Sequence, residues 1–410
     1  MAYTPPMPPA SVASAAVSIT SHLLDAGTRS RGLGETLTSL AARLQEAGVP
    51  VRRMRTSVTT KHPELFVLAV MWHAERGTEV RDGKRELLST PTFLESPVAE
   101  VRAGAPRVRC RLTGPDADLS YAIARELAAD GLTDYVVYPL IFGTGERTYF
   151  SFATDAPEGF SDDHLALFEA LLPVLSVRVE IESAGYALSS LLQVYLGHNA
   201  ASRVLEGAFL RGTGQPIHAA VWFCDMRGFT TLADRLPAAE VVTILDRFFE
   251  SVAGPIAPHG GEVLKFIGDA VLAIFPVQAD GAGAACERAL AAAHAAVAGV
   301  AAQNAIDTMP AVDLGIGLHV GEVMYGNIGA PNRLDFTVIG AVVNEVCRVE
   351  SLCRSLASPI LMTSAFAALC DQGRVESRGV HALKGVSAPQ EIFAPAARVW
   401  SAAGAQPGVG

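Results

Sequence analysis

The stretch Val221–Thr230 most constrains what this chain can fold into, because it joins an apolar strand, a carboxylate, a glycine turn and a helix start. Ala219–Phe223 is a nearly continuous apolar run, which predicts a strand covered on both faces. Asp225 follows where this strand is expected to end, and open α/β sheets present ligands at strand ends. Gly228 allows close backbone approach, and Thr230 can cap a helix whose exposed N–H groups would favour phosphate. By itself, the segment is equally compatible with an aspartate that only caps the helix.

Length and composition limit the remaining classes. The 410 residues suffice for two domains, each with its own core. A net charge of -10 argues against a nucleic-acid partner and against an anionic membrane surface. The six cysteines form no CxxC pair, which predicts reduced core thiols in a cytoplasmic protein. Met1–Leu24 lacks the basic region of a signal peptide, and the apolar stretch Ala282–Ala302 is interrupted by charged residues, so no membrane span is predicted.

The first half of the chain predicts an α/β domain over residues 34–181, after a flexible N-terminus with a short helix over residues 1–33. Residues 75–120 are polar and are expected to be irregular. Aromatic and β-branched residues around a glycine-rich turn predict a hairpin. The predicted elements are a helix over Gly34–Gly48, strands over Val51–Thr59 and Leu65–Ala74 joined through His62 and Pro63, a helix over Tyr121–Asp130, and hairpin strands over Tyr135–Phe142 and Arg147–Thr154.

A helix capped by Ser161 is predicted to close this domain near Ile181. A second helical stretch, within a linker over residues 182–212, carries an apolar stripe. The stripe is expected either to pair two chains or to pack on its own domain. Its members are Leu188, Leu191, Leu192, Tyr195 and Leu196.

The order of helix, strands, hairpin and closing helix resembles a GAF-type sensor domain over roughly residues 30–180. The resemblance implies either an unknown small-molecule ligand or dimerisation without a ligand. It identifies no ligand residues. His62, His73 and Cys110 are interpreted as ordinary polar or core side chains and not as metal or haem ligands.

The second half predicts alternating strands and helices with helical periodicity between glycine turns. Lys265 lies inside an apolar strand, where its charge is costly unless a nucleotide base or a carboxylate across an interface receives it. A tight Gly268-Asp269 turn follows. The predicted elements are strand 217–224, helix 237–253, hairpin 262–275, helix 280–303 and strand 312–323.

Several motifs in order resemble the catalytic domain of class III nucleotidyl cyclases. Asp225 stands before Gly-Phe-Thr, and Asp269 closes a Lys-x-x-Gly-Asp motif. Gly321–Gly329 and Asp335–Arg348 extend the similarity, which covers roughly residues 215–395. The resemblance implies an α+β fold with a ferredoxin-like βαββαβ core, over residues 213–400, followed by a tail over residues 401–410.

The resemblance also assigns roles around the first motif. Asp225 and Asp269, with the backbone of Met226, are implied to hold two Mg²⁺ or Mn²⁺ ions per active site. These ions would activate the ribose 3′-hydroxyl for in-line attack and neutralise the triphosphate. The backbone turn carrying Gly228, Phe229 and Thr230 would wrap the phosphates.

Asn344 and Arg348 lie four residues apart on a predicted helix and therefore project from one face. By resemblance, Asn344 orients the ribose, Arg348 offsets charge on the α-phosphate, and Lys384 contacts phosphate. Lys265 and Thr337 occupy the base-reading positions, where lysine with threonine favours ATP. A guanylate or mixed-specificity cyclase stays open, because a hydroxyl both donates and accepts.

The family places the metal carboxylates on one subunit and the base, ribose and transition-state residues on the other. The resemblance therefore implies a homodimer with active sites at the subunit interface. The expected activity is an adenylate cyclase that makes cyclic AMP and pyrophosphate and is regulated by the N-terminal domain. The other readings are a catalytically silent dimeric sensor and a bicarbonate-responsive enzyme of the threonine type. A diguanylate cyclase is disfavoured because the sequence holds no GG(D/E)EF motif.

Overall fold

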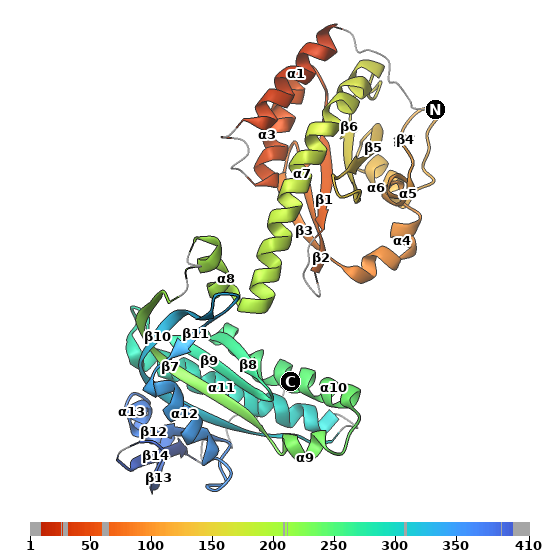
Figure 1. Cartoon of the computed structure of the whole chain (residues 1–410). Coiled ribbons are helices and arrows are strands. Elements are labelled where there is room, and N and C mark those ends of the chain that lie inside the picture. Colours follow the sequence, from red (N-terminus) through yellow and green to blue (C-terminus); the bar gives the residue numbers. More distant parts are fainter. Residues whose placement is uncertain are drawn as a thin grey trace. The chain divides into compact units, whose positions relative to one another are not determined.

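The chain folds into two compact units, Met1–Leu191 and Leu192–Gly410, in the computed structural model (Figure 1). The structure describes residues 10–25, 27, 32–59, 65–207, 210, 212–306, 310–386 and 388–396. The predicted flexible start before residue 10, the His62-Pro63 connection and the tail over residues 401–410 lie outside these described residues. Each unit is described by itself below.

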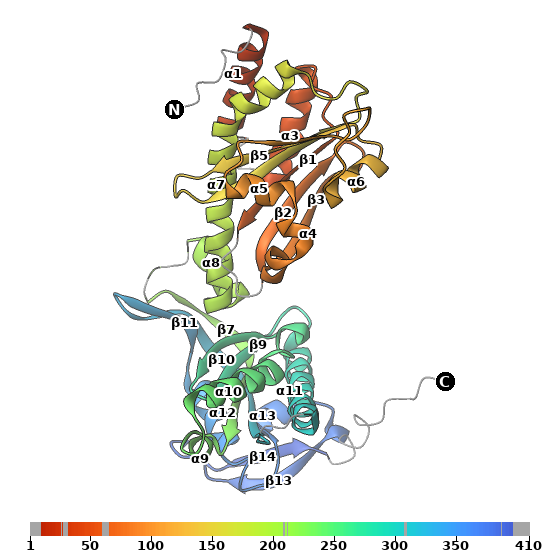
Figure 2. The same cartoon turned by 90° about the vertical axis from the view of Figure 1, so that its right-hand side faces the viewer.

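The first unit is a six-stranded antiparallel sheet in the order β3-β2-β1-β6-β5-β4, with helices on both faces (Figures 1 and 2). α1, α3 and α7 cover the face whose core contains Met54, Phe150 and Phe152. α5 and α6 cover the opposite face, around Tyr135 and Val137. The elements are α1 Ala10–Leu24, α3 Leu33–Glu46, β1 Arg53–Thr59, β2 Leu65–His73, β3 Gly77–Lys84, η1 Arg85–Ser89, α4 Pro91–Leu94, α5 Pro97–Ala103, β4 Val108–Arg111, α6 Ala122–Ala129, β5 Asp134–Ile141, β6 Arg147–Thr154 and α7 Asp162–Leu196.

Residues 75–120, which we expected to be irregular, contain β3, η1, α4, α5 and β4, so that expectation is wrong. The two short helices begin at side-chain caps: Thr90 accepts from the Phe93 amide, and Ser96 accepts from the Ala99 amide. Caps of this kind stabilise helix starts too short to show helical periodicity. At the start of the chain, α1 packs in the same core through Ile19 and Leu23.

The helix at the end of the first unit is longer than predicted. α7 continues through Ile181 to Leu196 despite Pro173, so no helix boundary lies at residues 181–182. As predicted, the Ser161 hydroxyl accepts from the His164 amide at its start. Gly197, with φ of +84°, then separates α7 from α8, because a left-handed backbone interrupts the helix.

The second unit is an eight-stranded sheet in the order β13-β14-β12-β10-β7-β9-β8, with β11 paired to β10. The central order β10-β7-β9-β8, joined by α10 and α11, is the predicted ferredoxin-like βαββαβ arrangement, and the α+β class is confirmed. The elements are α8 His198–Leu205, β7 Gly214–Arg227, α9 Phe229–Ala233, α10 Ala238–Ala253, η2 Ala257–His259, β8 Glu262–Ile267, β9 Ala270–Pro276, α11 Gly281–Ile306, β10 Asp313–Ala330, β11 Arg333–Ile339, α12 Ala341–Ser351, β12 Ile360–Thr363, α13 Ser364–Ala367, η3 Gln372–Arg374, β13 Val375–His381 and β14 Gln390–Pro395.

The two faces of this sheet have different coverings. Trp222 and Cys224 of β7 point into a core shared with α10 and α11. Ala219 and Val221 point to the other face, where Ala200 of α8 and Val346 of α12 join them. Side chains alternate along a strand, so Asp225 lies on the α12 face.

Among the described residues, α11 is the one helix long and apolar enough to cross a membrane by length and composition. Several of its residues, among them Ala289, Leu290 and Ala293, are fully or almost fully buried in the core of the second unit. This packing matches the prediction of a core helix.

Candidate active site

Two paired strands bring the predicted metal carboxylates together. Asp225 of β7 pairs with Ala270 of β9, so Asp269, at the β8–β9 turn, is its immediate neighbour across the ladder. Gly268 adopts φ of +65° in that turn, a conformation that glycine adopts without strain. β7 runs on to Arg227, so Asp225 lies within the strand and not at its end.

The two carboxyl groups share a hydrogen bond, and Asp269 destabilises the charged form of Asp225. Burial, the charge of Asp269 and that hydrogen bond raise the pKa of Asp225 to about 6. Burial also raises the pKa of Asp269. No basic side chain in the described part of the chain forms an ion pair with either carboxylate.

This uncompensated pair fits hard divalent cations, which take carboxylate oxygens as ligands. No cluster of three or more His, Cys, Asp or Glu side chains suited to a metal occurs within the described ranges. The remaining ligands would therefore be backbone oxygen, water and substrate phosphate, the usual complement of Mg²⁺ at phosphate-transfer sites.

The turn after Asp225 differs in one respect from the prediction. Gly228, with φ of +77°, is the N-cap of α9, and no side chain caps this helix. Thr230 lies inside α9, so its predicted capping role is wrong. Phe229 packs partly against the core, which fixes the turn beside β7.

α12 carries the two predicted catalytic side chains on its exposed face. Asn344 and Arg348 are exposed, whereas Val346 and Val349 are buried. The helix lies directly on Gly317 of β10, since a Cβ atom there would approach the Val346 carbonyl oxygen to 2.4 Å. Gly315 is equally covered, because its Cβ would meet Oε1 of Glu350 at 2.4 Å.

Glu350, which the sequence analysis missed, is a carboxylate beside the predicted metal pair, because it covers Gly315, the strand partner of Asp225. Burial, reinforced by the charge of Asp225, raises the pKa of Glu350 to about 7. Arg227 opposes this rise, and Asp269 adds to it. Within the local sequence, only its position two residues after Arg348 indicates a role at the site. The location of its carboxylate depends on Gly315 of β10, which is distant in sequence.

A second buried polar group fixes α12 from beneath. His319 of β10 has Nδ1 2.8 Å from the Thr363 hydroxyl and Nε2 3.5 Å from Oε2 of Glu345. Burial lowers the pKa of His319, although the Glu345 charge acts in the opposite direction. Glu345 follows Asn344 directly, so this contact positions the turn of α12 that carries Asn344.

The predicted base-reading residues lie on β8 and β11. Lys265 Nζ is 3.3 Å from Oδ2 of Asp335, so a carboxylate of the same chain receives its charge. The proposed carboxylate across an interface is therefore not needed. Thr337, two residues after Asp335 and on the same strand face, is buried, and its hydroxyl has no hydrogen-bond partner.

Lys384 stands apart from these groups. It is exposed in the turn between β13 and β14. Within the described residues, no hydrogen bond or ion pair joins it to the other predicted site residues.

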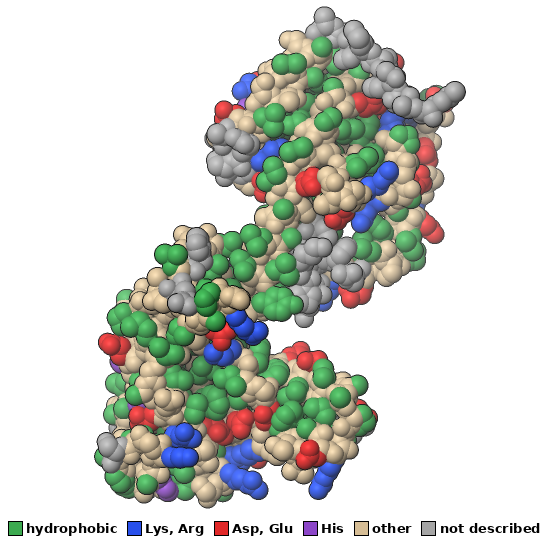
Figure 3. Space-filling model, in the orientation of Figure 1, with side chains coloured by type: hydrophobic (Ala, Val, Ile, Leu, Met, Phe, Trp, Pro, Cys, Tyr) green, Lys and Arg blue, Asp and Glu red, His purple; other side chains and the backbone are tan. Residues whose placement is uncertain are grey.

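On the face of the second unit displayed in Figure 3, acidic and basic side chains gather side by side amid a largely uncharged surface.

The adenylate and guanylate cyclase catalytic domain family matches residues 215–394. An uncharacterized protein of Mycobacterium tuberculosis is 42% identical over 151 residues, which are 37% of this chain and 27% of that protein. An uncharacterized protein of Mycobacterium bovis is 37% identical over 191 residues, 44% of this chain and 33% of that protein. The chain thus spans about a quarter to a third of the length of these curated relatives.

Solved structures of an adenylyl cyclase and of a guanylyl cyclase are similar to the chain. The adenylyl cyclase CyaB from P. aeruginosa is 26% identical with a TM-score of 0.41, covering 48% of this chain and 100% of its own. The guanylyl cyclase Cya2 is 30% identical with a TM-score of 0.40, covering 46% of this chain and 94% of its own.

Proposed function

Because residues 215–394 form a class III nucleotidyl cyclase catalytic domain, we propose that the protein is an adenylate cyclase. Its product would be 3′,5′-cyclic AMP. The 3′-oxygen of ATP would bond to the α-phosphorus while the bond to pyrophosphate breaks, and the hydroxyl proton would leave to solvent. The observation that carries the proposal is the pair of adjacent, uncompensated carboxylates Asp225 and Asp269.

Divalent ions held by Asp225 and Asp269 would supply charge neutralisation and a lower pKa for the attacking hydroxyl. The chain's own residues would orient the substrate. Asn344 would hold the ribose, and Arg348 would stabilise charge that builds on the α-phosphate, for which a positioned donor contributes on the order of 10²-fold or more in rate. Their exposed positions on α12 suit contact with a substrate bound partly by a second subunit.

The choice of ATP rests on Lys265 and Thr337. The buried Thr337 hydroxyl has no hydrogen-bond partner, and the amine of a bound adenine would supply one. A guanylate or mixed-specificity cyclase is the second candidate, because the Asp335 carboxylate beside Lys265 could accept from the N–H groups of guanine.

We place the active sites at the interface of a homodimer. Support comes from α7, where exposed apolar side chains repeat at alternating spacings of four and three residues, the heptad pattern of a two-helix seam. The first unit would act as the regulatory, GAF-like sensor. The residues of the repeat are Val177, Ile181, Ala184, Leu188, Leu191 and Tyr195.

The test is nucleotide turnover by the full chain with Mn²⁺, with ATP and GTP offered in parallel. Cyclic AMP that vanishes in Asp225→Ala but persists in Asp246→Ala, a matched change at an exposed aspartate on α10, supports the proposal. Cyclic GMP as the main product supports the second candidate. No product from either nucleotide in a confirmed dimer contradicts both and leaves the silent sensor.

A further inference from the structure

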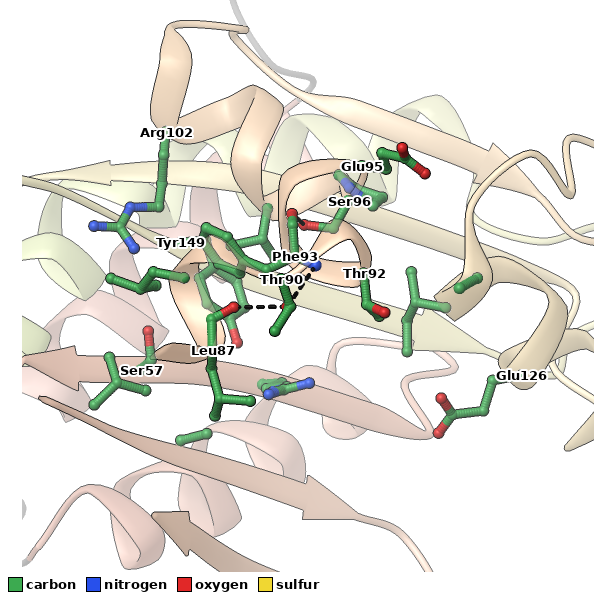
Figure 4. A pocket seen from close by; sticks show the side chains of 18 of the residues that line it. Ser57, Leu87, Thr90, Thr92, Phe93, Glu95, Ser96, Arg102, Glu126 and Tyr149 are labelled. Atoms are coloured by element: carbon green, nitrogen blue, oxygen red, sulfur yellow. Dashed lines mark hydrogen bonds between the residues drawn. The ribbon is translucent and has the colours of Figure 1, made fainter. Parts of the chain in front are cut away.

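The first unit contains a cavity of about 480 Å³ between its sheet and the helices of one face (Figure 4). Residues of β1, β2, β5 and β6 line its floor, and η1, α4, α5 and α6 contribute its walls. A volume of this size is typical of small-molecule sites. The cavity lies wholly within the first unit and is separate from the residues of the cyclase domain.

The walls are mainly apolar, and the hydroxyl groups of Thr90 and Ser96 are already engaged in hydrogen bonds. Figure 4 shows the Thr90 hydroxyl, which donates to the Leu87 carbonyl at 2.7 Å and accepts from the Phe93 amide at 3.3 Å. Ser96 likewise donates to the Phe93 carbonyl at 2.6 Å. These hydroxyls shape the wall. The apolar lining includes Val67, Ala69, Leu87, Phe93, Val98 and Ile123.

Arg55 is the exception on the floor. It lines the cavity from β1, an inner strand of the sheet, and its buried Nε has no hydrogen-bond partner. Its guanidinium forms no ion pair with any residue that the structure describes. Arg53, on the same face of β1, is buried, and its Nη2 donates a hydrogen bond to the Met71 sulfur at 3.5 Å. A partly buried cation without a partner is costly, and a second cation nearby adds to that cost.

The charges around the cavity indicate the ligand's charge. Arg55, Lys84 and Arg102 are basic, whereas Glu95 and Glu126 are acidic. The lining therefore carries one net positive charge at neutral pH, which a monoanion would neutralise. Both acidic side chains are exposed, so the inner end of the cavity is the positive end. A dianion such as a phosphate monoester would leave an excess negative charge beside the two glutamates.

We propose that this cavity binds a small monocarboxylate with an apolar aliphatic or aromatic body. The carboxylate pairs with the Arg55 guanidinium, whose planar fork matches two carboxylate oxygens. The apolar body fills the space lined by Phe93, Val98 and Ile123. The site is independent of the proposed cyclase activity, so binding itself is the readout.

The test is calorimetric titration of the full chain with 3-phenylpropionate and octanoate, each compared with its neutral amide. We expect the carboxylates to bind at least about tenfold more tightly than the amides, because only they pair with Arg55. Arg55→Met reduces carboxylate affinity to that of the amide. Arg43→Met, an exposed arginine on α3 at the other sheet face, leaves affinity unchanged.

A second variant separates the cavity from the fold of the strand. Ala122 lines the cavity but is exposed at the first position of α6, so Ala122→Phe fills the space without crowding the core. It should abolish binding of carboxylate and amide alike, with an unchanged circular dichroism spectrum. Absence of binding by either carboxylate at 5 mM (about 3 kcal/mol of affinity), or equal binding by Arg55→Met, overturns the proposal. Tighter binding of diphenyl phosphate overturns the carboxylate assignment.

Discussion

At the scale of single residues, the unpaired hydroxyl of Thr337 should lower the stability of the fold while it contributes to substrate recognition. A buried polar group without a partner costs about 1–3 kcal/mol, and valine has the same shape without the hydroxyl. We expect Thr337→Val to raise the free energy of unfolding while lowering kcat/KM for ATP at least about tenfold. Urea denaturation and turnover measure the two effects, and Thr337→Ser serves as the control that keeps the hydroxyl. Lower stability in Thr337→Val would mean that the hydroxyl is bonded in the protein.

His319 predicts a specific pH dependence of stability. Burial holds its pKa below the ordinary value of about 6.5, so the folded state favours the neutral ring. Its contribution is complete above pH 6.5 and is lost as the pH falls through the lower folded pKa. We expect His319→Gln to lose less stability than the wild type between pH 7.5 and 5.5, as measured by urea denaturation. His218→Gln, at an exposed histidine, is the control, and parallel curves for all three proteins would exclude His319 as the source.

At the scale of elements, α8 is attached to the strand that carries Lys265. The buried Glu262 carboxylate of β8 accepts from Asn199 of α8 at 3.1 Å and from the Tyr325 hydroxyl at 2.9 Å. The Arg203 guanidinium of α8 lies over the Tyr325 ring, 4.9 Å from its centroid. One carboxylate therefore joins α8, the helix after Gly197, to β8.

Removing one of these bonds should loosen α8 and β8 together. Tyr325→Phe leaves the Glu262 carboxylate with one fewer donor, which we expect to cost about 1–3 kcal/mol. Amide hydrogen exchange should quicken in α8 and β8 and stay unchanged in α11. Tyr195→Phe, at an exposed tyrosine, is the control. Unaltered exchange in Tyr325→Phe would show that the contact is not a coupling point.

The elements that sequence reasoning predicted well are the long ones. Strand β7, the β8–β9 hairpin and helices α10 and α11 have extended apolar runs or helical periodicity, so local pattern identifies them. The interval 75–120 was missed because β3 is mostly exposed and α4 has only four residues. Glu350 was missed for another reason. Its carboxylate occupies space that Gly315 of β10 leaves open, and the sequence of α12 alone does not indicate this.

At the scale of the whole molecule, the heptad repeat of α7 tests the proposed homodimer. Leu188→Glu with Leu191→Glu puts charges into a hydrophobic seam, and we expect monomers without activity. Sedimentation velocity and turnover measure the two properties. Gln193→Glu, on the same helix but outside the repeat, should stay dimeric and active. An active dimer of the double variant would place the interface elsewhere.

The proposed sharing of each active site between two subunits makes a separate prediction. Asp225→Ala and Arg348→Ala should each be inactive as homodimers, because every site lacks one partner. Co-expressed chains carrying different tags should yield heterodimers with one intact site, and therefore about half the turnover of the wild-type dimer. Purification through both tags and a turnover assay measure this. A heterodimer without activity would show that both residues act within one chain.

The bare backbone under α12 determines how precisely Asn344 and Arg348 are held. Their helix packs directly on the backbone of Gly317, whereas the Glu350 side chain covers Gly315. Peptide groups are planar and rigid, so the backbone of Gly317 offers a support that cannot change rotamer. Even one methyl group at Gly317 would act as a spacer and lift the helix that carries Asn344 and Arg348. The missing side chain at Gly317 thus limits how far α12, and with it Asn344 and Arg348, can be displaced from the sheet.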